Sequence, residues 1–69
     1  MSKAVKLVEK YLMEVTYNFK IVNVANREND YEFSIIEYDN LNNVENEYKL
    51  YVDKHFNGNI YNEFDDIIN

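Results

Sequence analysis

Apolar side chains recur at helical spacing at the start of the chain. Between Lys3 and about Glu14 they fall on one side of a helical wheel, namely Ala4, Val5, Leu7, Val8, Tyr11 and Leu12. Ser2 precedes this stretch and is a favoured N-cap residue. The pattern predicts an amphipathic helix over residues 3–14. Lys3 and Lys6 have the wrong sign for the first turn of a helix, so packing must hold this helix in place.

Beyond Val15 the apolar period changes from helical spacing to two, which predicts a first strand over residues 16–25. The apolar positions of this strand switch parity part-way along it, from Tyr17, Phe19 and Ile21 to Val22 and Val24. Such a switch indicates either a β-bulge or a strand that is buried on both faces.

Two further strands follow at short spacing, over residues 30–38 and 44–56. Polar loops at residues 26–29 and 39–43 separate them from their predecessors. Each strand carries alternating apolar residues on one face, namely Tyr31, Phe33 and Ile35 in the second and Tyr48, Leu50 and Val52 in the third. The three strands are therefore expected to form an antiparallel meander.

Asn57-Gly58 is the strongest local turn signal, because this pair tolerates the positive φ angles of a type I′ turn. A two-residue hairpin here would place Phe56 opposite Asn59, His55 opposite Ile60 and Lys54 opposite Tyr61, in a short fourth strand. Beyond it, Asn62 either caps a short helical turn with Phe64, Ile67 and Ile68 on one side, or begins an extended tail.

The predicted assembly is a single α+β domain, residues 1–69, with one helix packed on one face of a three- or four-stranded antiparallel sheet. The opposite face would be uncovered. We expect it to carry Ile36, Tyr38, Tyr51 and either Ile60 or Phe64, among Glu32, Glu37, Glu47, Lys49 and Asp53. Such a face is either an association surface or a solvated sheet lined with tyrosines.

Composition excludes several classes of chemistry. The 69 residues include no Cys, one His and one Gly, which rules out disulfides, thiolate- or His-based zinc sites and glycine-rich phosphate loops. No hydroxyl has the glycine context of a nucleophile elbow. We therefore expect no enzyme activity, no metal and no cofactor. Because apolar runs are short, we also expect no membrane span or signal peptide, and a cytoplasmic protein.

The net charge of −6 is unevenly distributed along the chain. Residues 1–27 hold five basic and two acidic side chains, for a net +3, whereas residues 28–69 hold two basic and eleven acidic ones, for a net −9. Direct nucleic-acid binding is disfavoured, because it relies on Lys and Arg to neutralise phosphates. The acidic part is expected either to bind a basic protein partner or only to keep the chain soluble.

Two resemblances bear on function. The layout of helix, meander and final hairpin, with Val52-Asp53 at its start and Gly58-Asn59-Ile60 at its close, resembles small PepSY-like domains. In size, acidity and its richness in Asn, Tyr and Glu, the chain is similar to small phage-encoded anti-defence proteins, including anti-CRISPR proteins that imitate DNA. The first resemblance implies a structural interaction domain, and the second an inhibitor.

The leading hypothesis is a non-enzymatic inhibitor that docks on a basic surface of a host nucleic-acid-binding or defence protein. The residues expected to contact this partner are Glu32, Glu37, Tyr38, Asp39, Glu45, Glu47 and Tyr51. The alternative is a PepSY-like domain that forms a homodimer through its uncovered sheet face or an edge strand.

Overall fold

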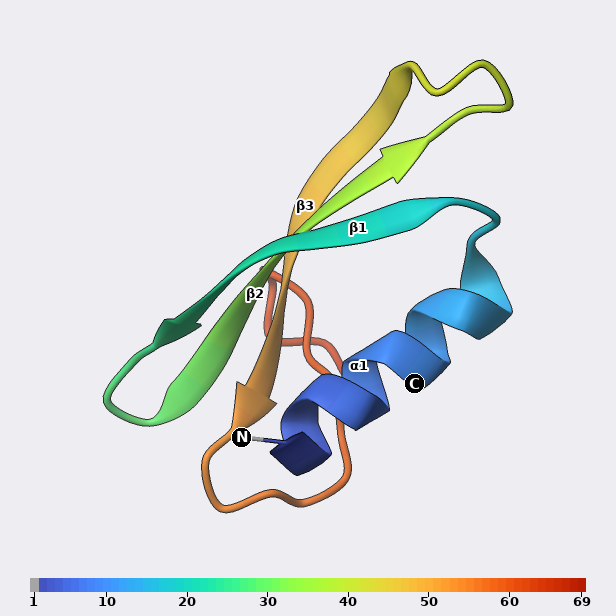
Figure 1. Ribbon diagram of the computed structural model, residues 1–69. Helices are drawn as coiled ribbons and strands as arrows, with labels where there is room; N and C mark the ends of the chain where they lie inside the picture. The colour runs from blue at the N-terminus through green and yellow to red at the C-terminus, as the bar shows by residue number, and fades with distance from the viewer. Residues whose placement is uncertain (1) are drawn as a thin grey trace.

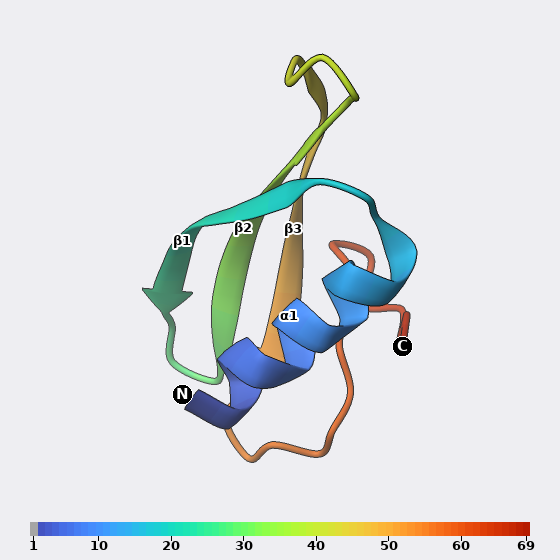
Figure 2. The same cartoon turned by 45° about the vertical axis from the view of Figure 1, so that its right-hand side comes forward.

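The computed structural model describes residues 2–69 and has the predicted α+β architecture (Figure 1). Helix α1 (Ser2–Val15) is followed by strands β1 (Phe19–Asn26), β2 (Asp30–Tyr38) and β3 (Val44–Asp53). The strands form one antiparallel sheet in the order β1-β2-β3. Figure 2 shows α1 lying across one face of this sheet. The helix begins one residue earlier than expected, at the residue predicted to cap it.

The core lies between α1 and the sheet. Its fully buried members come from the helix, the two inner faces of β2 and β3, and one residue beyond the sheet: Ala4, Val8, Leu12, Phe33, Ile35, Leu50, Val52 and Ile60. The helical and alternating periods identified in the sequence thus select the residues that are buried. The exception is Ile60, which the predicted hairpin placed on an edge strand.

The parity switch in the first strand is a β-bulge. The pairing between β1 and β2 shifts between Ile21 and Asn23, so that Val22 is the extra residue and is 45% exposed. Ile21 and Val24 consequently both pack against the core. A bulge in an edge strand also interrupts the regular ladder that another chain would need for pairing.

The predicted hairpin at Asn57-Gly58 is wrong. A type I′ turn needs positive φ at both central residues, but here Gly58 (φ 80°) and Phe56 (φ 46°) have positive φ whereas Asn57 does not. Tyr61 pairs with Tyr51 rather than with Lys54, through two backbone hydrogen bonds of 2.9 Å. This register buries Ile60, which the tight hairpin would not have done.

The C-terminal residues form no helix. Asn62 closes a turn instead of capping a helix, since its side-chain oxygen accepts hydrogen bonds from the backbone N–H groups of Phe64 (2.8 Å) and Asp66 (3.1 Å). The turn leads into an isolated bridge between Tyr61 and Ile67 instead of a helical turn. Of the three apolar residues expected on one side, Phe64 and Ile67 are exposed and only Ile68 packs against the core.

The two edges of the sheet differ. The C-terminal segment, residues 54–69, runs back beside β3 (Figure 2) and pairs with its edge through Tyr61. Farther along, a carboxylate oxygen of Glu63 accepts the backbone N–H of Lys49 at 2.9 Å, as a strand carbonyl would. Within residues 2–69, β1 has no strand on its outer side.

Candidate partner-binding site

The seven residues predicted to bind a partner separate into two groups in the structure. Four of them line one hollow near the tip of the β2–β3 hairpin: Glu37, Tyr38, Asp39 and Glu45. The other three, Glu32, Glu47 and Tyr51, belong to the sheet face opposite α1. The structure therefore divides the predicted contact residues between the hairpin tip and the outer sheet face.

The hollow at the hairpin tip, which we call the tip groove, lies between the end of α1 and the start of the β2–β3 loop. It has a volume of about 630 Å³ and is lined by Val15, Thr16, Tyr17, Glu37, Tyr38, Asp39, Asn40, Leu41 and Glu45. Figures 1 and 2 both show the hairpin tip extending beyond the helix and the rest of the sheet. The groove is thus placed where another molecule can approach it.

Large apolar side chains are unusually exposed around this groove. Tyr17 is 87% exposed, Leu41 81% and Val15 55%. Single exposed apolar residues are common on protein surfaces, but these three line the same hollow, beside three carboxylates. An apolar centre with a charged rim is the usual organisation of a protein–protein interface.

Local hydrogen bonds hold the loop that forms one wall of the groove. One carboxylate oxygen of Asp39 accepts the backbone N–H groups of Leu41 and Asn43, each at 2.9 Å. Asn42 adopts a positive φ of 62°, and its side chain accepts a hydrogen bond from the Asn18 amide at 3.0 Å. Asp39 therefore shapes the loop through one of its two carboxylate oxygens.

Glu37 lies on the helix side of the sheet, so its predicted place on the uncovered face is wrong. It is in phase with Phe33 and Ile35, and one of its oxygens accepts a hydrogen bond from the Tyr48 hydroxyl. Burial, and then this bond to a carboxylate, raise the pKa of Tyr48 well above its ordinary value. Tyr48 thus stays protonated and holds the side chain of Glu37, which lines the tip groove.

Glu32 is neutralised by its own neighbours on the outer face. Its carboxylate accepts hydrogen bonds from the Tyr51 hydroxyl (3.0 Å), from Arg27 (3.0 Å) and from Lys49 (3.3 Å), and its side chain is 19% exposed. The bond from Tyr51 is the largest of the effects that lower the pKa of Glu32. Glu32 and Tyr51 are therefore brought together as predicted, but in a network that satisfies its own charge.

This network predicts how stability depends on pH. The pKa of Glu32 is lower in the folded than in the unfolded chain. The stabilisation that the ionised Glu32 side chain gives to the fold is therefore fully present above the ordinary glutamate range near pH 4.5, and it is lost as the pH falls through the folded pKa. We expect Glu32→Gln to lower the urea midpoint of unfolding at pH 7. The difference in midpoint between the variant and the wild type should become smaller below about pH 4.5.

Urea denaturation followed by circular dichroism between pH 3 and pH 7 measures this gap. Glu28→Gln is the matched control, because Glu28 is exposed in the β1–β2 turn and its carboxylate makes no hydrogen bond within residues 2–69. A gap between wild type and Glu32→Gln that is the same at every pH would contradict the assigned role of the Glu32 charge.

Glu47 lies in a separate, smaller hollow of about 290 Å³ on the outer face. Its neighbours there include Val22, Ile36, Lys49 and Glu63. The opposite charges of Lys49 and the two glutamates lie close together, so this hollow does not share the uniform charge of the tip groove.

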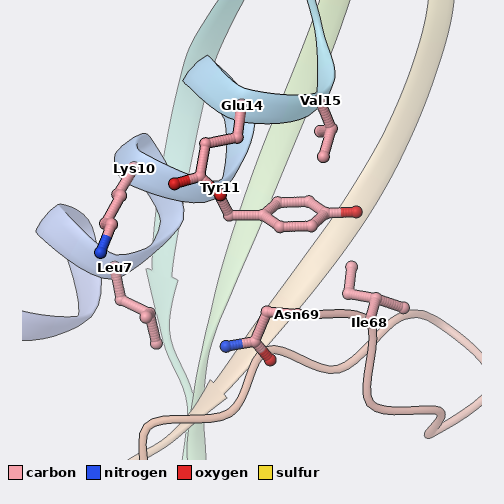
Figure 3. A pocket seen from close by; sticks show the side chains of 7 residues that line it. All are labelled: Leu7, Lys10, Tyr11, Glu14, Val15, Ile68 and Asn69. Atoms are coloured by element: carbon pink, nitrogen blue, oxygen red, sulfur yellow. The ribbon is translucent and has the colours of Figure 1, made fainter.

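Another hollow, of about 410 Å³, lies where α1 meets the C-terminal residues (Figure 3). It is lined by Leu7, Lys10, Tyr11, Glu14, Val15, Ile68 and Asn69. In Figure 3 the Tyr11 ring extends from the helix above Ile68 and Asn69. The lining is mostly apolar and includes one acidic and one basic side chain. We therefore interpret this hollow as the boundary between two packed segments and not as a recognition site.

Within residues 2–69, no group of three or more His, Asp or Glu side chains is arranged to hold a metal ion. No helix in the same range has the length and apolar character needed to cross a membrane. Comparisons with protein-family models, with curated proteins and with solved structures gave no match.

Sequence reasoning missed Tyr17, Leu41 and Val15 as site residues. Tyr17 was assigned to the first strand because it alternates with Phe19 and Ile21, whereas β1 begins only at Phe19. Leu41 did carry a signal. An apolar residue in the middle of the polar loop at residues 39–43 has little to pack against within its own chain.

Proposed function

We propose that this protein is a non-enzymatic binding module that inhibits a basic protein by docking on it through the tip groove. The best-fitting partner is a host nucleic-acid-binding or defence protein, as in the anti-defence proteins of phages. The observation that carries the proposal is the convergence of three carboxylates with exposed Tyr17 and Leu41 at the projecting end of the molecule.

Charge and exposed apolar surface both support this assignment. A surface that binds a nucleic-acid backbone is rich in Lys and Arg, and the carboxylates of the tip groove would occupy it as phosphates do. The eleven acidic and two basic side chains of residues 28–69 supply a field that steers such a surface toward the groove. The apolar side chains then add buried contact area that phosphates lack.

Glu45→Lys is expected to abolish capture of the partner from a lysate of the native host at low salt. Glu45 is an exposed carboxylate at the rim of the groove, so reversing its charge repels a basic partner without disturbing the core. Glu28→Lys makes the same change of charge in the β1–β2 turn and should leave capture intact. The proteins retained by each variant are identified and quantified by mass spectrometry.

Capture by the wild-type chain should also fall as salt is added, because exposed charges are screened. Equal loss of capture in the Glu45→Lys and Glu28→Lys variants would mean that general acidity, not the tip groove, attracts the partner. A captured set without basic proteins would overturn the proposal. If light scattering instead gives twice the monomer mass, self-association through the outer sheet face becomes the better explanation.

A further inference from the structure

The tip groove combines acidic and aromatic side chains but contains no basic one. Glu37, Asp39 and Glu45 line it together with Tyr17 and Tyr38, and no Lys or Arg is among its lining residues. On the opposite sheet face, a similar combination of carboxylates and a tyrosine ring surrounds an arginine of the chain itself. In that arrangement, carboxylates and a tyrosine ring bind an arginine side chain.

On the outer face, Arg27 contacts two carboxylates and one tyrosine ring. Its Nε atom lies 3.0 Å from an Asp30 oxygen and its Nη1 atom 3.0 Å from a Glu32 oxygen. Its guanidinium carbon lies 5.2 Å from the centre of the Tyr51 ring, within the range of a cation–π interaction. A planar guanidinium can make these contacts at once, because its donors lie at the edge while its face stacks on the ring.

We propose that the tip groove binds an arginine side chain of the partner, with the guanidinium against Tyr17 and paired with Glu45. This inference rests on the proposed function and specifies the chemistry of the occupant. Leu41 and Val15 supply apolar surface for the three methylene groups of the arginine. The charge of the groove is uniformly negative, so it is complementary to this occupant.

The groove should prefer arginine to lysine. A lysine ammonium is compact and strongly hydrated, whereas the guanidinium is weakly hydrated, stacks on aromatic rings and can pair with a carboxylate through two donors. Both cations satisfy the charge of Glu45 equally, so the preference comes from stacking and from paired hydrogen bonds. Selectivity therefore separates a built arginine site from general electrostatic attraction.

The test uses two capped peptides of equal charge, hexa-arginine and hexa-lysine, each titrated into the full-length ¹⁵N-labelled protein. We expect hexa-arginine to bind tighter by about threefold or more, as an exposed cation–π contact provides. The amide signals that shift should be those of the groove, namely Tyr17, Tyr38, Asp39, Asn40, Leu41 and Glu45. Equal affinity for both peptides, or shifts centred on other residues, would overturn the proposal.

Two variants locate the source of the preference. Tyr17→Leu keeps an apolar side chain but removes the ring. The ratio of the affinities for hexa-arginine and hexa-lysine should therefore fall toward one, while both peptides still bind weakly. Glu45→Gln should lower the affinity for both peptides. Glu28→Gln removes the same charge from the β1–β2 turn and should lower these affinities less. Because Tyr17 and Glu45 are exposed, their variants are expected to fold, and the spectra themselves check this.

The outcome is independent of the capture experiment. If the groove captures a partner and Glu45→Lys abolishes this, but the two peptides bind equally, the arginine assignment fails and the inhibitor proposal stands. If arginine is preferred at the groove but the captured proteins do not depend on Glu45, the arginine site stands and the proposed function fails.

Discussion

Replacing Phe33 with alanine should cost about 3–5 kcal/mol of folding free energy, which is the range observed for truncating a buried phenylalanine. Phe33 is fully buried at the centre of β2, between Val24 of β1 and Leu50 of β3. A domain of this size has a total stability of only about 3–10 kcal/mol. We therefore expect the variant to lose a large part of its free energy of unfolding, so that its cooperative transition weakens, as measured by urea denaturation and circular dichroism.

Phe64→Ala is the matched control, because it deletes the same side chain at a position that is 83% exposed. Its free energy of unfolding should stay within about 0.5 kcal/mol of the wild-type value. If the two variants were equally stable, the core would not be centred on the contact between α1 and β2.

Periodicity was sufficient to predict the part of the fold that contains Phe33. Alternation places Phe33 and Ile35 on one face, and the 3.6-residue period places Val8 and Leu12 toward them. The switch of parity after Ile21 was compatible with a bulge or with a strand buried on both faces, and the structure has the bulge, at Val22. These patterns succeed because burial of each side chain is dictated by its own position within a regular element.

The C-terminal segment could not be predicted in the same way, because its register is set by tertiary contacts. Asn57-Gly58 has a strong local preference for a tight hairpin, but that hairpin would carry Ile60 to an edge. The structure instead adopts a wider connection in which Ile60 is fully buried and Tyr61 meets Tyr51. Burying one isoleucine side chain is worth about 1.5–3 kcal/mol, which exceeds what a favourable turn type provides.

The candidate site was predicted only in part, for a related reason. Of the seven residues predicted to bind a partner, three carboxylates and one tyrosine line the tip groove. What the sequence could not show is that Glu32 is neutralised by Arg27 of the β1–β2 turn and by Lys49 of β3. Charge counted along a chain therefore overstates how much of it is available to a partner.

Ile60→Ala should reveal whether the C-terminal segment is an integral part of the fold. Ile60 is fully buried in the core although it lies outside the helix and the three strands. Its truncation is expected to lower the free energy of unfolding by about 2–4 kcal/mol. The measurement is again urea denaturation, and Ile67→Ala, at a position 55% exposed in the same segment, is the control and should cost much less.

Hydrogen exchange extends this test from the core to the edge of the sheet. The N–H groups of Tyr51 and Tyr61 each donate to the carbonyl of the other residue at 2.9 Å, and the N–H of Lys49 donates to Glu63. If Ile60 anchors the segment, these three amides should exchange faster in Ile60→Ala, by more than the amides between β1 and β2. Uniform acceleration would mean that the segment opens only with the whole domain. Selective acceleration would show that one buried side chain keeps the edge of β3 closed to other strands.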